Sequence, residues 1–163
     1  HEFDLEQYDY IIDAIDSLTN KVHLIREATK LKSVFFSSMG ASLKIDPTKI
    51  KVAKFWDVNG CPLGAILRKR LRKGELPAKN FLCVYSNEVL ENKGLLKSCK
   101  TEHCTCTKST NAPGNPDLAD HEWCSLKAQT NGTTSHITAI FGFTLAGLVI
   151  QDIVKSCETN EKP

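Results

Sequence analysis

The sequence has little net charge: 21 Lys and Arg residues stand against 19 Asp and Glu residues, which leaves a formal net charge of +2. Bulk electrostatic attraction to nucleic acid or to an acidic membrane is therefore excluded, and a basic binding site has to be local. The chain has 163 residues, of which 41% are hydrophobic and 25% charged, a composition typical of one ordinary globular domain. We expect a single domain over residues 1–163.

Features of secretion and of membrane insertion are also missing. The sequence starts His1-Glu2-Phe3-Asp4, which is acidic where a signal peptide has a basic region. Its seven cysteines are an odd number, which without secretory features favours reduced thiols over a disulfide framework. The most apolar run, residues 137–150, has 14 residues before Gln151 and Asp152, whereas a membrane span needs about 20. We predict a cytoplasmic protein with a buried core helix at this run and no membrane partner.

Apolar periodicity indicates an α/β protein. Residues 8–15 and 34–38 read as buried strands, and residues 18–31 between them repeat apolar positions at the helical period. Such a crossover joins parallel strands, so we predict a Rossmann-like doubly wound sheet with helices on its faces. Further along, the pattern predicts a strand near 50–55, a helix over 62–73, a strand over 81–86 and a long irregular loop insertion over 87–133. A closing apolar helix, capped by Thr134 or Ser135, is expected to lie across the sheet through Ile137, Phe141, Leu145 and Leu148.

An acidic residue stands where the first strand gives way to the first helix. The run Tyr10-Ile11-Ile12-Asp13-Ala14-Ile15-Asp16-Ser17 places Asp16 at this turn, next to Ser17 as the expected helix N-cap. Open α/β sheets bind their ligands at the carboxyl ends of the strands, and a carboxylate there could hold Mg²⁺ on a nucleotide. Acids are equally favoured at helix starts for their own sake, so Asp16 could instead simply cap the helix.

The glycine-rich turn of a nucleotide-binding domain is absent. Such domains carry G-x-G-x-x-G between the first strand and the first helix, where backbone amides hold the phosphates. No such motif occurs in this sequence. The chain also opens almost directly on a strand, so we expect that the sheet begins earlier, in a longer polypeptide.

Separated sequence blocks, in order, carry a resemblance to a known family. The chain resembles the carboxyl-terminal part of the ThiF, MoeB and HesA superfamily of ubiquitin-activating-type adenylating enzymes, and within it is most similar to the tRNA threonylcarbamoyladenosine dehydratase branch. The similarity covers nearly the whole chain except the loop around residues 91–130. The matching blocks are DYIIDAIDSLTNKVHLI, SSMGASLKIDPTKIKVAKF, CPLGAILRKRLRK, VYSNE and HITAIFGFTLAGLVIQDIV.

The resemblance implies that this chain is the carboxyl-terminal portion of a Rossmann-like ThiF-type domain. Family members carry the glycine-rich loop and other ATP-binding residues in their first half, so the chain is expected to be inactive alone. Asp16 matches the acid that lies by the ATP phosphates and their Mg²⁺, where a metal offsets the negative charge of attack on the α-phosphate. Lys21 could point to the same site or lie in solvent. Gly40, in the turn Met39-Gly40-Ala41, could border the ligand or form an ordinary tight turn.

Cysteines give weaker signals. Relatives of the MoeB and ThiF type carry two C-x-x-C pairs for structural zinc, whereas only Cys61 stands near the first expected position, so we predict no structural zinc. Cys106 and Cys124 are candidate nucleophiles, which would need a lowered thiol pKa, but no motif selects either. A second possible zinc cluster has spacings that fit no standard signature, so free surface thiols are favoured there; its members are Cys99, His103, Cys104, Cys106, His121 and Cys124.

A dense basic patch lies on the helix predicted over residues 62–73. It could contact tRNA phosphates, or it could be a solvated face whose cations suit the carboxyl end of a helix. Its members are Arg68, Lys69, Arg70, Arg72 and Lys73.

Three functions are compatible with these features. The leading one is ATP-dependent cyclisation of N6-threonylcarbamoyladenosine in tRNA by dehydration, as the resemblance implies. The second is adenylation of a ubiquitin-like sulfur-carrier protein, as in molybdopterin or thiamin synthesis; the missing zinc pairs count against it. The third is a noncatalytic dimerisation or binding module, for which the missing glycine-rich loop is the best argument. The resemblance also implies a homodimer.

Overall fold

The computed structural model describes residues 4–93 and 131–160. The chain divides into two compact units, and all the helices and strands among the described residues belong to the unit formed by residues 1–90 and 133–163. Candidate nucleophiles Cys106 and Cys124, the cluster around them and most of the predicted loop insertion lie outside the described residues. The described strands are β1 (Tyr10–Asp13), β2 (Val34–Ser38), β3 (Ile50–Lys54) and β4 (Leu82–Ser86), and the helices longer than one turn are α1 (Leu18–Lys30), α2 (Pro62–Arg72) and α3 (Ser135–Asn160).

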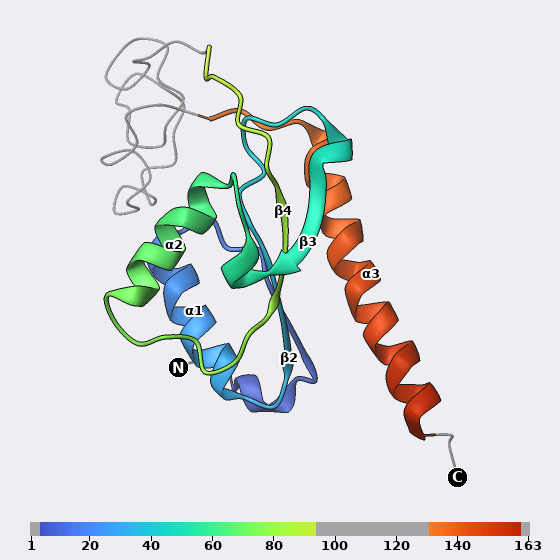
Figure 1. The fold of residues 1–163 in the computed structure, drawn as a ribbon. Helices are drawn as coiled ribbons and strands as arrows, with labels where there is room; N and C mark the ends of the chain where they lie inside the picture. The colour runs from blue at the N-terminus through green and yellow to red at the C-terminus, as the bar shows by residue number, and fades with distance from the viewer. Residues whose placement is uncertain (1–3, 94–130, 161–163) are drawn as a thin grey trace, which may run out of the picture. The chain divides into compact units, whose positions relative to one another are not determined.

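The four strands form one open sheet in the order β1-β2-β4-β3 (Figure 1). β1, β2 and β4 are parallel, with Ile12 opposite Phe36 and Ser37 opposite Cys83, whereas β3 runs antiparallel to β4. The predicted Rossmann-like α/β architecture is confirmed. Because the three parallel strands share a direction, their carboxyl ends meet at one edge of the sheet, where such folds place their ligands.

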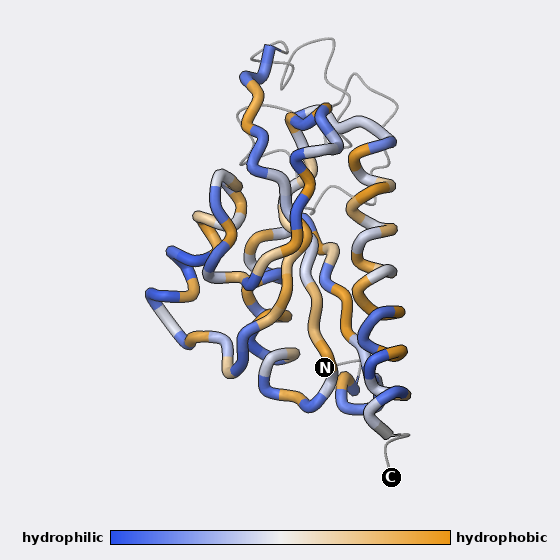
Figure 2. The backbone as a smooth tube through the Cα atoms, turned by 45° about the vertical axis from the view of Figure 1, so that its right-hand side comes forward, coloured by the Kyte–Doolittle hydropathy of each residue, from blue (hydrophilic) through white to orange (hydrophobic). Residues whose placement is uncertain are grey.

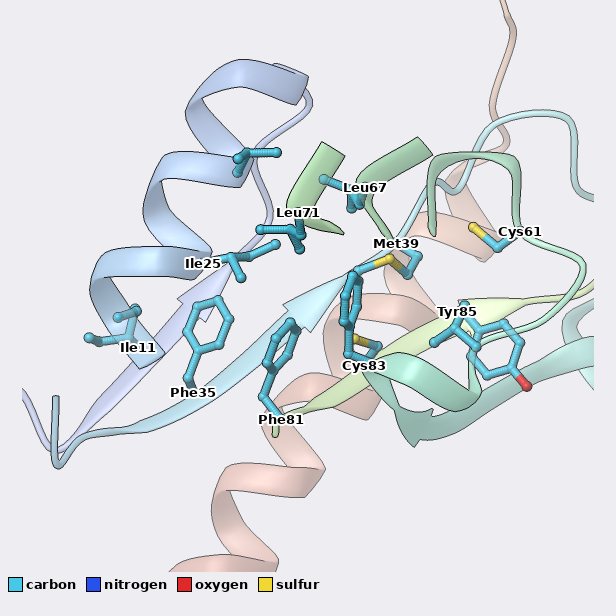
Figure 3. Packing of buried hydrophobic residues seen from close by; sticks show 14 residues of the cluster. Ile11, Ile25, Phe35, Met39, Cys61, Leu67, Leu71, Phe81, Cys83 and Tyr85 are labelled. Carbon is cyan, nitrogen blue, oxygen red and sulfur yellow. The ribbon is translucent and has the colours of Figure 1, made fainter. Parts of the chain in front are cut away.

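Helices cover both faces of the sheet. α1 and α2 pack on one face, and α3 lies on the other (Figure 1). Between the sheet and α1 and α2, the ring of Phe81 lies 4.9 Å from those of Phe35 and Phe55, and Ile25 and Leu71 are fully buried beside them (Figure 3). The apolar residues that recur at the helical period in α1 and α2 are thus the ones that pack on the sheet.

α3 differs most from its prediction. One stripe, Ile137, Phe141 and Leu145, is buried against Phe36 and Val84 as expected. The helix nevertheless continues through Gln151 and Asp152 to residue 160, and only 17% of its most apolar 18-residue window is buried. The prediction of a buried core helix is therefore wrong for most of its surface, as the exposure of Phe143 shows (77%).

By length and composition alone, α3 could cross a membrane. Figure 2 shows apolar residues along most of its length. Its buried stripe packs on the sheet, however, and the Tyr10 hydroxyl donates to Asp152 Oδ2 at 2.9 Å, which fastens the second half of α3 to β1. The expectation of no membrane partner stays a prediction.

Candidate functional site

A buried ionic cluster lies at the carboxyl end of β1. Asp13, the last residue of β1, stands opposite Ser37 of β2, whose hydroxyl donates to Asp13 Oδ2 at 2.7 Å. Lys21 Nζ, from the first turns of α1, lies 2.7 Å from the same oxygen. The side chains of Asp13 and Lys21 are both fully buried. Because both charges are removed from water, each serves as the counter-charge of the other, and the carboxylate of Asp13 also accepts the hydrogen bond from the Ser37 hydroxyl.

The same cluster fixes the turn that leads from β1 into α1. Asp13 Oδ1 accepts a hydrogen bond from the Ile15 N–H at 3.0 Å, and Lys21 Nζ donates to the Ile15 carbonyl at 3.3 Å. Asp13 thereby turns the chain, and this is why β1 ends at residue 13 rather than at the predicted residue 15. Both backbone polar groups of Ile15 are held by side chains.

Asp16 comes directly after Ile15 and is exposed at this turn. The N-cap residue of α1 is Ser17, one position later, with an extended backbone (φ −65°, ψ 117°) and no hydrogen bond from its side chain to the helix. Asp16 therefore stands just before the helix start, beyond the end of β1, in the place where the sequence predicts a ligand contact.

The structure contradicts one of the two interpretations of Lys21. The prediction that Lys21 lies in solvent is wrong, because its side chain is 0% exposed. The physical reason is the carboxylate of Asp13, which in a buried position requires a counter-charge. The alternative, a direct contact with the nucleotide, stays a prediction, and the structure gives the ammonium group two partners within the protein, Asp13 and the Ile15 carbonyl.

Gly40 lies just after β2 at the same edge of the sheet. The Met39 N–H donates to the Val84 carbonyl at 2.8 Å, which keeps this segment beside β4. A Cβ atom on Gly40 would meet only Leu63, at 3.5 Å, which is ordinary contact, and Gly40 is not among the residues with positive φ. Neither the backbone nor the packing of the described residues therefore requires glycine here, and the predicted role beside a ligand remains open.

A second buried pair, Lys44 and Glu88, holds the loop after β2. Lys44 Nζ donates to the Glu88 carbonyl, and Glu88 Oε2 accepts from the N–H groups of Ile45 and Asp46 at 2.8 and 3.0 Å. These backbone hydrogen bonds lower the pKa of the Glu88 carboxyl, whereas burial lowers the pKa of Lys44. His136 Nε2 donates to the Ile45 carbonyl at 3.0 Å, which ties the loop to α3.

The sequence did not predict the buried pair of Lys44 and Glu88. The one signal that points to it is an acid two residues after the buried strand β4, in the block VYSNE. Periodicity does not reveal Lys44, because it stands in a loop with no regular spacing.

The chain is similar to curated tRNA threonylcarbamoyladenosine dehydratases. It is 33% identical to the Escherichia coli enzyme over 142 residues, which are 83% of this chain and 48% of that protein. It is 25% identical to the Bacillus subtilis enzyme over 152 residues, which are 92% of this chain and 52% of that protein. A solved structure of the E. coli tRNA N6-threonylcarbamoyladenosine dehydratase in complex with ATP matches 93% of this chain with a TM-score of 0.63 and 24% identity, and the match covers 50% of that structure.

Sequence and fold thus agree along most of the chain. The chain is therefore similar in sequence and in fold to these dehydratases, which are of the ThiF/MoeB type. It spans about half the length of the curated relatives that it matches. No family model matches the sequence.

The basic patch on α2 is only partly free for a partner. Arg68 Nη1 donates to the Phe55 carbonyl at 3.4 Å, and the Arg72 guanidinium lies 5.3 Å from the ring centroid of Trp56. Both arginines therefore bind the short helix at Phe55–Asp57. The other three residues of the patch are exposed, and none of their side chains has a hydrogen-bond or ion-pair partner among the described residues; they are Lys69, Arg70 and Lys73.

The described part of the chain contains no group of three His, Cys, Asp or Glu residues that could hold a metal ion by itself. Cys61 is buried at the N-cap of α2, and burial raises the pKa of the Cys83 thiol, so neither is prepared for nucleophilic chemistry. The exposed carboxylate of Asp16 beyond β1 could contribute one ligand to a Mg²⁺ ion whose other ligands are phosphate oxygens and water.

Proposed function

We propose that this chain supplies one half of the ATP site of an enzyme that cyclises N6-threonylcarbamoyladenosine in tRNA. The observation that supports this most is the similarity to curated dehydratases along most of the chain, with Asp16 exposed beyond the carboxyl end of β1. The relative solved with ATP supports a nucleotide as the second substrate.

The proposed reaction has two steps. An oxygen of the threonylcarbamoyl carboxylate attacks the α-phosphate of ATP, forming an acyl-adenylate and releasing pyrophosphate. The ureido group of the same substrate then attacks the activated carbonyl, which closes a five-membered ring and releases AMP, while a base takes the ureido N–H proton. In the first step, Asp16 would hold a Mg²⁺ ion on the phosphates, where the ion offsets developing negative charge.

Other parts of the chain have supporting roles in this proposal. Gly40 would border the nucleotide, and the exposed cations of α2 would contact the tRNA backbone. We also propose a homodimer, as the resemblance implies, and a cytoplasmic location, which the odd number of cysteines favours.

The phosphate-binding loop has to come from residues outside this chain, because no glycine-rich turn occurs in it. The isolated 163-residue chain should therefore bind Mg-ATP weakly or not at all. Isothermal titration calorimetry checks this directly. Tight binding of Mg-ATP by the isolated chain would contradict the half-site.

The activity is tested on the full natural polypeptide that carries these residues. It is incubated with ATP, Mg²⁺ and tRNA bearing N6-threonylcarbamoyladenosine, and the tRNA nucleosides are then analysed by mass spectrometry. We expect the modified nucleoside to lose one water in an ATP-dependent manner. A parallel incubation offers a ubiquitin-like sulfur carrier instead, and formation of a carrier adenylate without tRNA cyclisation would contradict the proposal. Absence of both products would favour the noncatalytic module.

A further inference from the structure

The buried cluster of Asp13, Lys21 and Ser37 has a consequence for the nearby Asp16. We propose that these three are positioning residues that hold Asp16 in place for Mg-ATP, and that none of them touches the ligand. The inference rests on the proposed function, because it assigns a task to Asp16. It differs from the sequence-based expectation, in which Lys21 itself contacts the nucleotide.

Geometry carries the first step. Asp13 holds the N–H group of Ile15 and Lys21 holds its carbonyl group, at 3.0 and 3.3 Å. The peptide bond that joins Ile15 to Asp16 therefore has its oxygen fixed by a buried ammonium group. Asp16 follows this peptide directly, so the fixed Ile15 carbonyl holds the backbone from which the exposed Asp16 side chain leaves the fold.

Burial carries the second step. The side chains of Asp13 and Lys21 are 0% exposed, so neither offers an atom to a ligand at the sheet edge. Ser37 is equally buried and uses its hydroxyl on Asp13. Within residues 14–17, Asp16 provides the one carboxylate, and it is exposed.

Energetics carries the third step. A buried ion pair rarely stabilises a protein more than a well-packed apolar pair of the same volume, because desolvation of the two charges offsets their attraction. Stability alone therefore does not explain a lysine and an aspartate at these positions. What an apolar pair would lack is the set of donors and acceptors that fixes both backbone groups of Ile15.

The test removes both charges together, in Asp13→Asn/Lys21→Met of the full natural polypeptide. The new asparagine retains an oxygen for the Ile15 N–H and an amide for Ser37, and the new methionine fills the volume of the lysine stem, so no uncompensated charge is left. The Ile15 carbonyl loses its donor. We expect a free energy of unfolding close to that of the wild type, a fall in kcat for cyclisation of at least about tenfold, and a several-fold rise in the Mg²⁺ concentration for half-maximal activity.

Lys30→Met is the matched control on the same helix. Lys30 pairs with Glu27 and Glu75 at the surface, at 3.0 and 3.2 Å, far along α1 from the turn. Its loss should leave kcat and the Mg²⁺ requirement unchanged. A folded double variant that also has wild-type kcat and Mg²⁺ requirement would overturn the inference.

Two further variants keep the test decisive. Ser37→Ala removes one hydrogen bond from Asp13 without stranding a charge; we expect a measurable rise in its Mg²⁺ requirement, and it carries the test if the double variant does not fold. A Mg²⁺ requirement unchanged in folded Ser37→Ala would then overturn the inference. Asp16→Asn separates the two levels: full activity there overturns the proposed site and the positioning role together, whereas loss there with an unaffected double variant overturns the positioning role alone.

Discussion

Two glycines of this chain differ in what their surroundings demand. Gly60 has a φ of +63°, and a Cβ atom there would lie 2.9 Å from Asn87 Cβ, whereas Gly40 has neither constraint. We expect Gly40→Ala to change the free energy of unfolding by less than about 0.5 kcal/mol, and Gly60→Ala to lower it by more than about 1 kcal/mol. Urea unfolding measures both changes.

Gly40→Ala also tests the ligand site. If Gly40 borders the nucleotide, its added methyl group raises the KM for ATP of the full polypeptide while stability stays constant. An unchanged KM in this stable variant would remove Gly40 from the site.

Glu88 makes stability depend on pH. Backbone hydrogen bonds from Asp46 and Ile45 hold the pKa of its carboxyl below the ordinary value of 4.5. The folded state therefore binds the proton less readily than the unfolded state, so the contribution of Glu88 is present above pH 4.5 and is lost as the pH falls through the lowered pKa. Glu88→Gln should be less stable than the wild type at neutral pH, and the difference should shrink in acid. Thermal unfolding of both proteins is followed from about pH 7 to about pH 3, and a stability difference that stays constant would contradict this role of Glu88.

The residues of the site were predictable to different degrees. The position of Asp16 beyond β1 follows from local order alone, because an acid after an apolar strand and before a helix start falls at the ligand edge of a parallel sheet. The partnership of Asp13 with Lys21 and Ser37 is not, because Ser37 lies 24 residues away and meets Asp13 only through the register of β1 and β2. Sequence spacing also cannot tell a buried lysine from an exposed one when the burying partner is a single carboxylate.

At the scale of elements, α2 carries the proposed contact with tRNA. Lys69 and Lys73 are exposed on α2 and just after it, whereas Lys51 and Lys54 are exposed on β3 and serve as a matched pair of controls. We expect Lys69→Gln/Lys73→Gln to weaken tRNA binding and to reduce the slope of log affinity against log salt by about 1 per lost phosphate contact. Lys51→Gln/Lys54→Gln should leave both quantities unchanged. Equal effects of the two double variants, measured by filter binding over a salt series, would indicate only a loss of general charge.

The elements themselves match their sequence patterns closely where packing is local. α1 begins at Leu18 and α2 at Pro62, as predicted, because apolar periodicity and a proline in the first turn are local signals. The carboxyl end of α3 has no such local signal, because Gln151 and Asp152 end the apolar run while the helix continues to residue 160. The antiparallel direction of β3 is likewise set by its pairing with β4 rather than by its own residues.

At the scale of the whole molecule, the sheet presents one side of the proposed ligand site. Beyond the carboxyl ends of β1, β2 and β4 lie Asp16, Gly40 and Glu88, respectively. No glycine-rich phosphate loop occurs in the sequence. The match to about half the length of the curated relatives agrees with this division. In this proposal the full polypeptide is the active enzyme, and Asp16 is the residue through which this chain contributes to catalysis.

The decisive comparison uses two aspartates that flank one strand. Asp9 is exposed just before the amino end of β1, and Asp16 is exposed beyond its carboxyl end, so Asp→Asn at each removes one surface charge. The rate of ATP-dependent cyclisation of N6-threonylcarbamoyladenosine in tRNA is measured for both variants of the full natural polypeptide. We predict a loss of at least about a hundredfold for Asp16→Asn, in line with removal of a group that stabilises transition-state charge, and a wild-type rate for Asp9→Asn. Equal rates for the two variants would contradict the proposed role of Asp16.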